Sequence, residues 1–431
     1  MNDTAIKKTQ ENTADIAADA AASLKPAGTL RAVTTVMKLE LTERVRSKKW
    51  IAAMIVWVAV VVIMWIGSRT VVTGGAPLDA SPDNLSFHLQ AGRWAFSLLL
   101  IFTLGVALLI SPALSSTSIN GARDTANLAI LQATPITAGQ LLWGKLLAAW
   151  IAGVVFVLVG ALPLTIITIL YALGWQVFIK SLLIMFVEVF MVCALGIGFS
   201  ALISRPVASV LVTYVMVTAL VIGGPLGFLF TLNSVTKPWE YETMSLNYEG
   251  SENIWDKYPE EERYPGLNIE PGWKCTREHS MQTATLTGKT WWMLMSSPIT
   301  ILADGAAGKQ LRGANPAGFD SALSVISLGI TQSRYQRDDI DQMLKTVKDV
   351  KPPRISIYDE CYLKGTEIVP IYADPEAANR KLSQDNWQDY TGTSWYWGLG
   401  FHAVLTLGAL VTAWRRLRLP VKRLPRGVRI A

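Results

Sequence analysis

Six long apolar segments constrain this chain more than any other feature of its sequence. A helix needs about 20 mostly apolar residues to cross the ~30 Å hydrocarbon core of a bilayer, because it rises about 1.5 Å per residue. Charged residues make up only 17% of the chain, against about 25% in soluble proteins. The pattern excludes a disordered chain and an ordinary cytosolic enzyme, and it predicts an all-α polytopic membrane protein with six transmembrane helices. The segments are Trp50–Gly67, Trp94–Leu114, Leu146–Leu173, Phe178–Ile203, Pro206–Leu232 and Trp395–Trp414.

The fifth segment contains the triplet Gly223-Gly224-Pro225. Proline lacks a backbone N–H and its ring clashes with the preceding helical turn, so the triplet is expected to interrupt the helix. Two placements are open, a break at the membrane surface and a kink inside the bilayer.

Lys and Arg in short loops predict the orientation, because cytoplasmic loops carry an excess of them. Basic clusters precede the first segment and follow the last, so both termini are expected in the cytoplasm, which six spans permit. The basic excess is then an orientation signal and a contact with membrane lipid, and it calls for no nucleic acid. The clusters are Arg44, Arg46, Lys48 and Lys49 at one end, and Arg415, Arg416, Arg418, Lys422, Arg423, Arg426 and Arg429 at the other.

Two stretches precede the first span. Residues 1–28 are rich in Ala, Asp, Thr and Lys and are typical of a disordered cytoplasmic tail. Residues 29–49 place apolar side chains at three- and four-residue spacing, which predicts an interfacial amphipathic helix; a plain cytosolic extension of the first span is the alternative. The apolar positions are Leu30, Val33, Met37, Leu41 and Val45.

Residues 233–394 form a separate block in composition. They carry 17 Lys and Arg against 23 Asp and Glu, which gives this block a net charge of −6. The whole chain has a net charge of +6, so the residues outside this block have a net charge of +12. A stretch this long is the size of a domain. Since the N-terminus is expected in the cytoplasm and five spans precede this block, we expect a large α+β extracytoplasmic domain inserted between helices 5 and 6. Its apolar stretch Trp291–Ala303 is too short to span, and is either domain core or a segment resting on the outer leaflet.

Cys275 and Cys361 both fall in this block, whereas Cys193 lies in the fourth span. An exported location is oxidising, so a Cys275–Cys361 disulfide is expected, with two free buried thiols as the alternative. Closing so long a loop stabilises a domain by about 4 kcal/mol in the chain-entropy treatment.

Catalytic and metal-binding patterns are lacking in the sequence. His88, His279 and His402 lie far apart, and no H-E-x-x-H or G-x-S-x-G motif occurs. No catalytic or metal site is therefore predicted. Glu188 is an ionisable residue deep in the fourth span, and it should face the bundle or a polar cavity, either as a structural group or as part of a substrate or proton path.

The loop at 115–145 is the most specific region. It reads INGARDTANLAILQATPITAGQLLWGK from Ile119 to Lys145, and Thr137 is placed to cap a helix that enters the third span. This loop resembles that of the membrane subunits (permeases) of type-2 ABC exporters, which read like E-R-x-x-G-T-L…T-P-(I/L)…L-x-G-K. Ala122 and Ala126-Asn127 depart from the pattern. The matching residues are Arg123, Leu128, Leu131, Thr134, Pro135, Ile136, Leu141, Leu142, Gly144 and Lys145.

The resemblance implies a transport subunit that is not itself an enzyme and holds no cofactor. A separate ABC ATPase, carrying ATP and Mg, would dock on the loop, and a second permease subunit, identical or related, would complete the pathway. The apolar third to fifth spans favour export of an amphiphilic or hydrophobic substrate such as a lipid, glycan, peptide or antibiotic. The alternative function is a membrane sensor or mechanotransmission protein whose outer domain binds a ligand or partner. The ATPase-coupling residues implied are Arg123, Asp124, Leu128, Leu131, Thr134 and Pro135.

Overall fold

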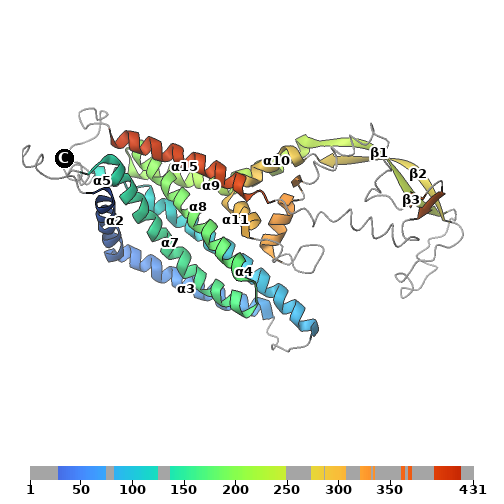
Figure 1. Ribbon diagram of the computed structural model, residues 1–431, viewed down its shortest axis with the longest axis horizontal. Coiled ribbons are helices and arrows are strands. Elements are labelled where there is room, and N and C mark those ends of the chain that lie inside the picture. Colours follow the sequence, from blue (N-terminus) through green and yellow to red (C-terminus); the bar gives the residue numbers. More distant parts are fainter. Residues whose placement is uncertain are drawn as a thin grey trace, which may run out of the picture. The chain divides into compact units, whose positions relative to one another are not determined.

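The computed structural model consists mainly of long helices (Figure 1). Six are long and apolar enough to cross a membrane, in agreement with the six predicted segments. Their bounds are Lys48–Thr73 (α3), Pro82–Ser115 (α4), Ala138–Leu170 (α7), Trp175–Leu202 (α8), Pro206–Val235 (α9 to α10) and Trp395–Leu417 (α15). The structure describes residues 28–73, 82–124, 136–248, 273–285, 287–306, 321–331, 333–334, 361–364, 367–370 and 393–418.

The chain divides into two compact units. The first contains Met1–Pro225, Met295–Ser327 and Ser394–Ala431, and the second contains Leu226–Leu294 and Leu328–Thr393. The predicted extracytoplasmic domain at 233–394 stays a prediction; in this division residues 295–327 group with the spans. The physical reason is the helix α11 (Pro298–Ala306), which packs against α8 and α15.

Helix α8 is at the centre of the first unit. It contacts α4, α7, α9, α11 and α15, and 61% of its most apolar window is buried, against 11% for α3. Small residues let the backbones approach closely, as is common between membrane helices. A Cβ on Gly198 would lie 2.7 Å from the Cβ of Ala409 in α15, and one on Gly153 would lie 2.6 Å from Val189 Cγ1.

The predicted amphipathic helix is present as α2 (Thr29–Arg46), and it packs against α7. Its buried face is centred on Ala32 and Val36, whereas Leu30 and Val45 are exposed. The face of α2 that packs against α7 therefore differs at both ends from the predicted apolar stripe. The reason is that the contact with α7 selects small side chains, which allow the two helices to approach closely. The interfacial position of α2 stays a prediction.

The fifth span keeps its helical path through the Gly-Gly-Pro triplet. It consists of α9 (Pro206–Thr218), a π-helical turn η1 (Ala219–Gly223) and α10 (Gly224–Val235). The predicted interruption is thus a single wide turn directly before Pro225. Such π turns are rare and are frequent at functional sites.

The second part of the apolar segment Trp291–Ala303, from Pro298 onward, packs against two of the spans, whereas Trp292 is exposed. Ile301 and Leu302 of α11 are completely buried, and a Cβ on Gly305 would lie 2.4 Å from Ile184 Cδ1 of α8. Asp304 supplies the missing cap of α15, since its Oδ2 accepts hydrogen bonds from Trp395 N (2.8 Å) and Ser394 Oγ (3.2 Å). An apolar helix of this length cannot span, but it can bury all its apolar surface against two helices that do.

The second unit contains two antiparallel strand pairs. Strand β1 (Thr236–Tyr248) pairs with β2 (Trp273–Thr285), and β3 (Cys361–Lys364) pairs with β4 (Glu367–Pro370). Thr236 lies opposite Thr285, and Tyr248 lies opposite Trp273. Short helical segments also occur between residues 226 and 334, with bounds Thr287–Lys289 (η4), Trp291–Ser296 (η5) and Ala322–Thr331.

Much of the predicted outer domain lies outside the described residues, including 249–272, 335–360 and 371–392. An α+β domain on the outside of the membrane therefore remains a prediction. Cys275 lies near the start of β2 and Cys361 is the first residue of β3, but the side chains of both are not among those described. The predicted disulfide likewise stays a prediction.

Candidate functional site

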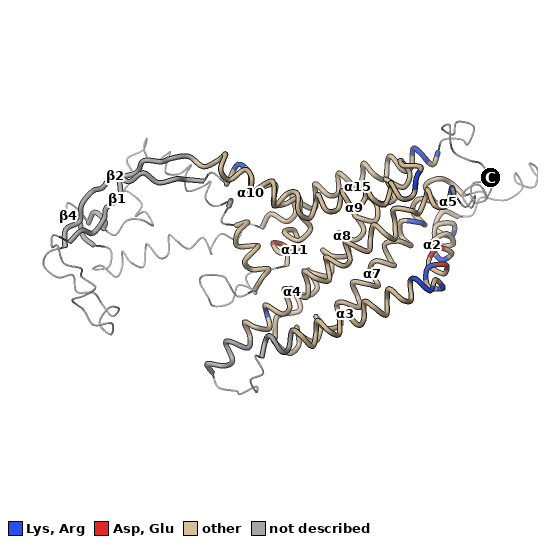
Figure 2. Tube along the Cα trace, turned by 180° about the vertical axis from the view of Figure 1, so that it is seen from behind, with Lys and Arg blue, Asp and Glu red and all other residues tan. Residues whose placement is uncertain are grey.

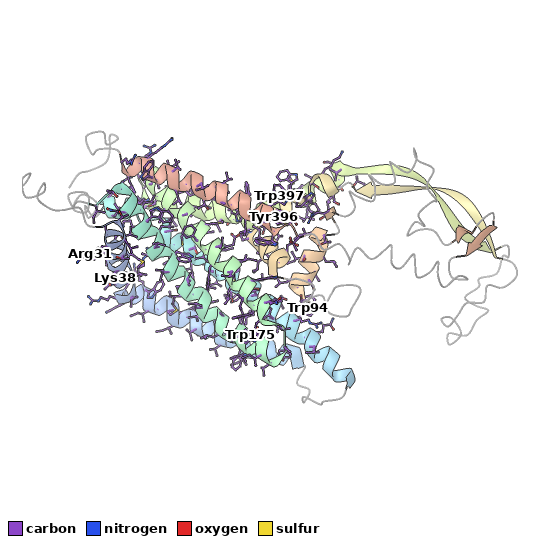
Figure 3. All side chains as sticks on the ribbon, viewed as in Figure 1. Arg31, Lys38, Trp94, Trp175, Tyr396 and Trp397 are labelled. Carbon is purple, nitrogen blue, oxygen red and sulfur yellow. The ribbon has the colours of Figure 1, made fainter. Side chains whose placement is uncertain are left out.

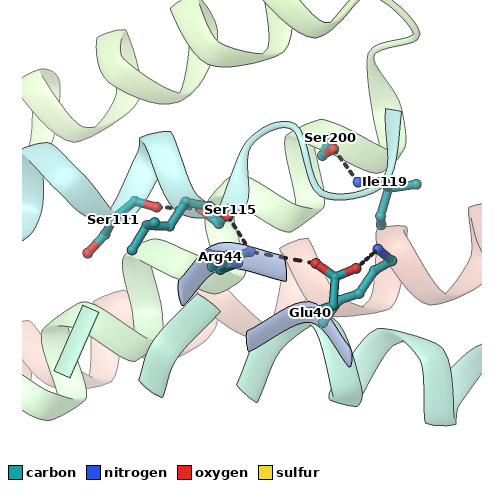
Figure 4. Close-up of polar contacts among 8 residues, drawn as sticks. Glu40, Arg44, Ser111, Ser115, Ile119 and Ser200 are labelled. Atoms are coloured by element: carbon teal, nitrogen blue, oxygen red, sulfur yellow. Dashed lines mark hydrogen bonds and ion pairs between the residues drawn. The ribbon is translucent and has the colours of Figure 1, made fainter. Parts of the chain in front are cut away.

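The predicted coupling loop begins with a tight turn that is fixed to the end of α8. Helix α4 ends at Ser115, and a short helix α5 (Asn120–Asp124) follows. The backbone N–H groups of Ile119 and Asn120 both donate to Ser200 Oγ, at 2.9 and 3.1 Å (Figure 4). These are the orphan donors at the start of α5, so a side chain of α8 provides its cap.

Two further bonds hold α5 to the same end of α8. Asn120 Nδ2 donates to the Ile203 carbonyl at 3.3 Å, and Arg123 Nη1 donates to the Ala201 carbonyl at 3.4 Å. The last carbonyls of a helix lack intrahelical partners, so α5 in turn satisfies α8. A displacement of α5 is therefore passed directly to α8.

The turn before α5 also contacts α9 and α2. Ser209 Oγ of α9 donates to the Ser116 carbonyl at 2.7 Å, and Arg44 Nη2 of α2 donates to the Leu114 carbonyl at 2.9 Å. Residues 114–123 thus bind three other helices through polar contacts that are largely buried. Among the described residues, this junction therefore links the end of α4 to α2, α8 and α9.

An ion pair joins α2 to the start of α7. Lys145 Nζ contacts Glu40 Oε1, and the Lys145 side chain is only 3% exposed. Arg44 Nη2 lies 3.9 Å from the other carboxylate oxygen of Glu40. Glu40 therefore lies between two cations. Burial lowers the pKa of the Arg44 guanidinium from its usual value, and the charge of Glu40 opposes this shift.

The neighbouring Gly144 explains why α2 can come so close. A Cβ at this position would lie 2.6 Å from Val36 Cβ, so any larger residue would push α2 away and separate Glu40 from Lys145. The adjacent Gly144 and Lys145, which the sequence singled out, therefore act together as a docking point for α2.

The predicted cap at Thr137 is confirmed. Thr137 Oγ1 accepts from Gln140 N at 3.3 Å, and Gln140 Oε1 accepts from Thr137 N at 2.8 Å. This reciprocal pair is a capping box, and the contribution of Gln140 was missed although the T-x-x-Q pattern is visible in the sequence. It fixes the residue at which the loop ends and α7 begins.

The other predicted coupling residues are only partly described. Asp124 is the last residue of α5, and its side chain is not among those described. Leu128, Leu131, Thr134 and Pro135 lie outside the described residues. Their role in contacting an ATPase stays a prediction.

A second buried contact, between two ionisable groups, lies within the spans. Glu188 of α8 is completely buried, as its place on an apolar helix predicts, and its Oε2 lies 3.0 Å from His402 Nδ1 of α15. His402 Nε2 lies 2.9 Å from the Ser296 carbonyl, and because a carbonyl only accepts, Nε2 carries a hydrogen. Sequence reasoning missed His402 as a partner, although it is an ionisable group within an apolar span and such groups tend to pair.

Charged and aromatic side chains are distributed unevenly over the first unit. Most of its described Lys and Arg residues gather at the end of the bundle that holds α2 and α5 (Figure 2). Arg31 and Lys38 lie at this end, whereas Trp94 and Trp175 lie toward the other end (Figure 3). Among the side chains that are described, no cluster of three or more His, Cys, Asp and Glu could hold a metal ion.

The sequence of the chain matches the family described as "ABC-2 family transporter protein" over residues 34–340, which is more than half of its length. The chain belongs to this family. It is the membrane component of an ABC transporter, a multi-pass transport subunit with no catalytic role of its own expected, and the family implies an ATPase partner. A comparison with curated protein sequences found no match.

Proposed function

We propose that this permease exports an amphiphilic or hydrophobic substrate, driven by a separate ATPase that docks on the loop at 115–145. The junction of residues 114–123 with α2, α8 and α9 carries this proposal. A force applied to the loop would reach three helices at once through short, buried polar contacts. That is the property a coupling site needs.

The orientation follows from the charge distribution. Most of the described basic residues gather at the α2 end, and cytoplasmic ends carry such an excess. This end, with both termini, then faces the cytoplasm, and the ATPase reaches it from there. The segment 233–394 between the fifth and sixth spans would then lie on the outside of the membrane.

The ionisable groups within the spans support the substrate class. Glu188 and His402 contact each other, so neither is left to neutralise an ionic substrate. The third to fifth spans otherwise present mostly apolar side chains, which suit a lipid-like or amphipathic molecule. Since six spans are few for a closed pathway, a second permease subunit, identical or related, would form the other half.

The test is purification of the tagged permease from its native host in mild detergent. An ABC ATPase should co-purify, and its ATP hydrolysis should depend on the loop. Charge reversal at Arg123 (Arg123→Glu) should reduce the amount of ATPase recovered, whereas the exposed Arg31→Glu in α2 serves as a control. Recovery of no ATPase with the intact permease would contradict the proposal, and a complex that hydrolyses ATP but moves no lipid-like substrate in vesicles would favour signalling over transport.

A further inference from the structure

The π turn in the fifth span is completed by a residue from outside that span. Pro225 has no N–H to donate to the carbonyl of Val221, its acceptor four residues earlier in a regular helix. Val221 O instead accepts a hydrogen bond from Ser297 Oγ at 2.9 Å, 76 residues further along the chain. Ser297 is 1% exposed, so water does not compete for this bond. Ser297, in the segment leading into α11, therefore adds a hydrogen bond to the π turn from outside the fifth span.

The preceding residue is held by a different span. The carbonyl of Ser296 contacts His402 Nε2 at 2.9 Å, and His402 in turn contacts Glu188 of α8. Two adjacent residues thus bind the two spans that flank the long segment 233–394. Ser296 binds the sixth span and Ser297 binds the fifth.

The two contacts differ in strength. The sixth-span side is reinforced by the ionisable pair Glu188–His402 and by Asp304, whose carboxylate caps α15, and bonds to charged groups are roughly twice as strong as neutral ones. The fifth-span side is a neutral hydroxyl–carbonyl bond. The Ser297–Val221 contact is therefore the weaker side of this junction.

We propose that Ser297 is a positioning residue of the transport cycle, whose bond to Val221 holds the fifth span in its π-turn form at rest and is released when the ATPase acts. This rests on the proposed function, because the release needs a driven movement of the spans. The coupling junction is joined to α9 by Ser209 and to α8 by Ser200, so both sides receive the movement. Loss of the bond frees the π turn, which can then shift as a hinge while α8, α15 and α11 stay together.

The contact itself is tested by hydrogen exchange of the full-length permease in lipid nanodiscs, followed by mass spectrometry of peptides that cover residues 215–230. Ser297→Ala should speed exchange of these amides by about three- to tenfold, as expected for loss of one net hydrogen bond. Ser297→Cys keeps a side chain of similar size, but the thiol is a weaker hydrogen-bond donor, so this variant should increase the exchange rate less than Ser297→Ala does. It also provides a second variant to measure if Ser297→Ala does not fold. Ser181→Ala is the matched control, because that buried hydroxyl donates within its own helix, to Val177 O.

Pro225→Ala provides a second, independent check. It restores the N–H that can serve Val221, so adding Ser297→Ala in this background should change exchange by less than about twofold. Equal effects of Ser297→Ala with and without Pro225, or no effect at all, would overturn the proposed contact.

The role in the cycle is tested on the permease–ATPase complex, with and without ATP and vanadate. In the wild type, nucleotide should speed exchange at 215–230, and Ser297→Ala should already show the faster exchange without nucleotide. If peptides from the loop at 115–145 respond and those at 215–230 do not, the proposal for Ser297 fails while the transport function stands. If neither region responds to nucleotide, the proposed function fails as well.

Discussion

Removing either charge of the Glu40–Lys145 pair should have unequal effects on stability. The Lys145 side chain is 3% exposed and the Glu40 side chain is 18% exposed. Glu40→Gln leaves the Lys145 ammonium buried without a counter-charge, and breaking a buried pair in this way costs about 3 kcal/mol. Lys145→Met leaves Glu40 with partial access to water and with Arg44 at 3.9 Å, so this change should cost only about 1 kcal/mol.

The double variant sharpens the comparison. Adding Lys145→Met to Glu40→Gln removes the stranded charge, so the double variant should be more stable than Glu40→Gln alone by about 1–2 kcal/mol. The assay is the free energy of unfolding of the purified protein in mixed micelles, from a dodecyl sulfate titration followed by tryptophan fluorescence. Exposed Lys38→Met and Glu43→Gln on the same helix are controls and should stay within about 0.5 kcal/mol of the wild type.

Three results would refute this reasoning. Equal losses in Glu40→Gln and Lys145→Met would show that the pair is solvated on both sides, and losses below about 0.5 kcal/mol in both would show that the contact contributes nothing measurable. A lower free energy in the double variant than in Glu40→Gln would show that the two residues act independently.

Three further outcomes are expected. Ser200→Ala should expose the two N–H groups at the start of α5, costing about 1–2 kcal/mol and speeding hydrogen exchange at 119–124, whereas unchanged exchange would contradict its capping role. Glu188→Leu should lower the free energy of unfolding by about 3 kcal/mol and Glu188→Gln by about 1 kcal/mol, because the amide can still bond the His402 ring; equal values in the same titration would argue against the pair. Cys275 and Cys361 should appear as one cross-linked peptide in a non-reducing digest of protein isolated with thiols blocked, and recovery of both as alkylated peptides would exclude the disulfide.

The spans could be predicted well because a membrane enforces a local rule. Each crossing helix must satisfy its own backbone hydrogen bonds and show an apolar surface, so hydropathy along the chain is sufficient to find it. The predicted sixth span began at Trp395, as α15 does, and the predicted cap at Thr137 was confirmed for the same reason: both signals lie within a few residues. Family membership was also visible in the local loop pattern.

The candidate site was predicted less completely because its contacts are distant in sequence. Glu188 was recognised as buried, but its partner His402 lies 214 residues away and no local pattern links them. Lys145 was noted as part of a motif, yet its partner Glu40 was seen only as one polar residue of an amphipathic helix. The helix α11 was placed in an outer domain or on a membrane surface, since a short apolar segment fits several environments equally well.

The sequence by itself determined the number of spans, the helix before the first one, the start of α7 and the family of the protein. These depend on composition and on short-range hydrogen bonding, which the chain carries at each position. Only the tertiary structure decided that Ser200 caps α5, that α11 packs among the spans, and that Ser297 donates a hydrogen bond to the π turn before Pro225. A missing donor or a buried charge shows in the sequence that a partner is needed, but many residues can meet that need, and close packing of the helices selects which one does.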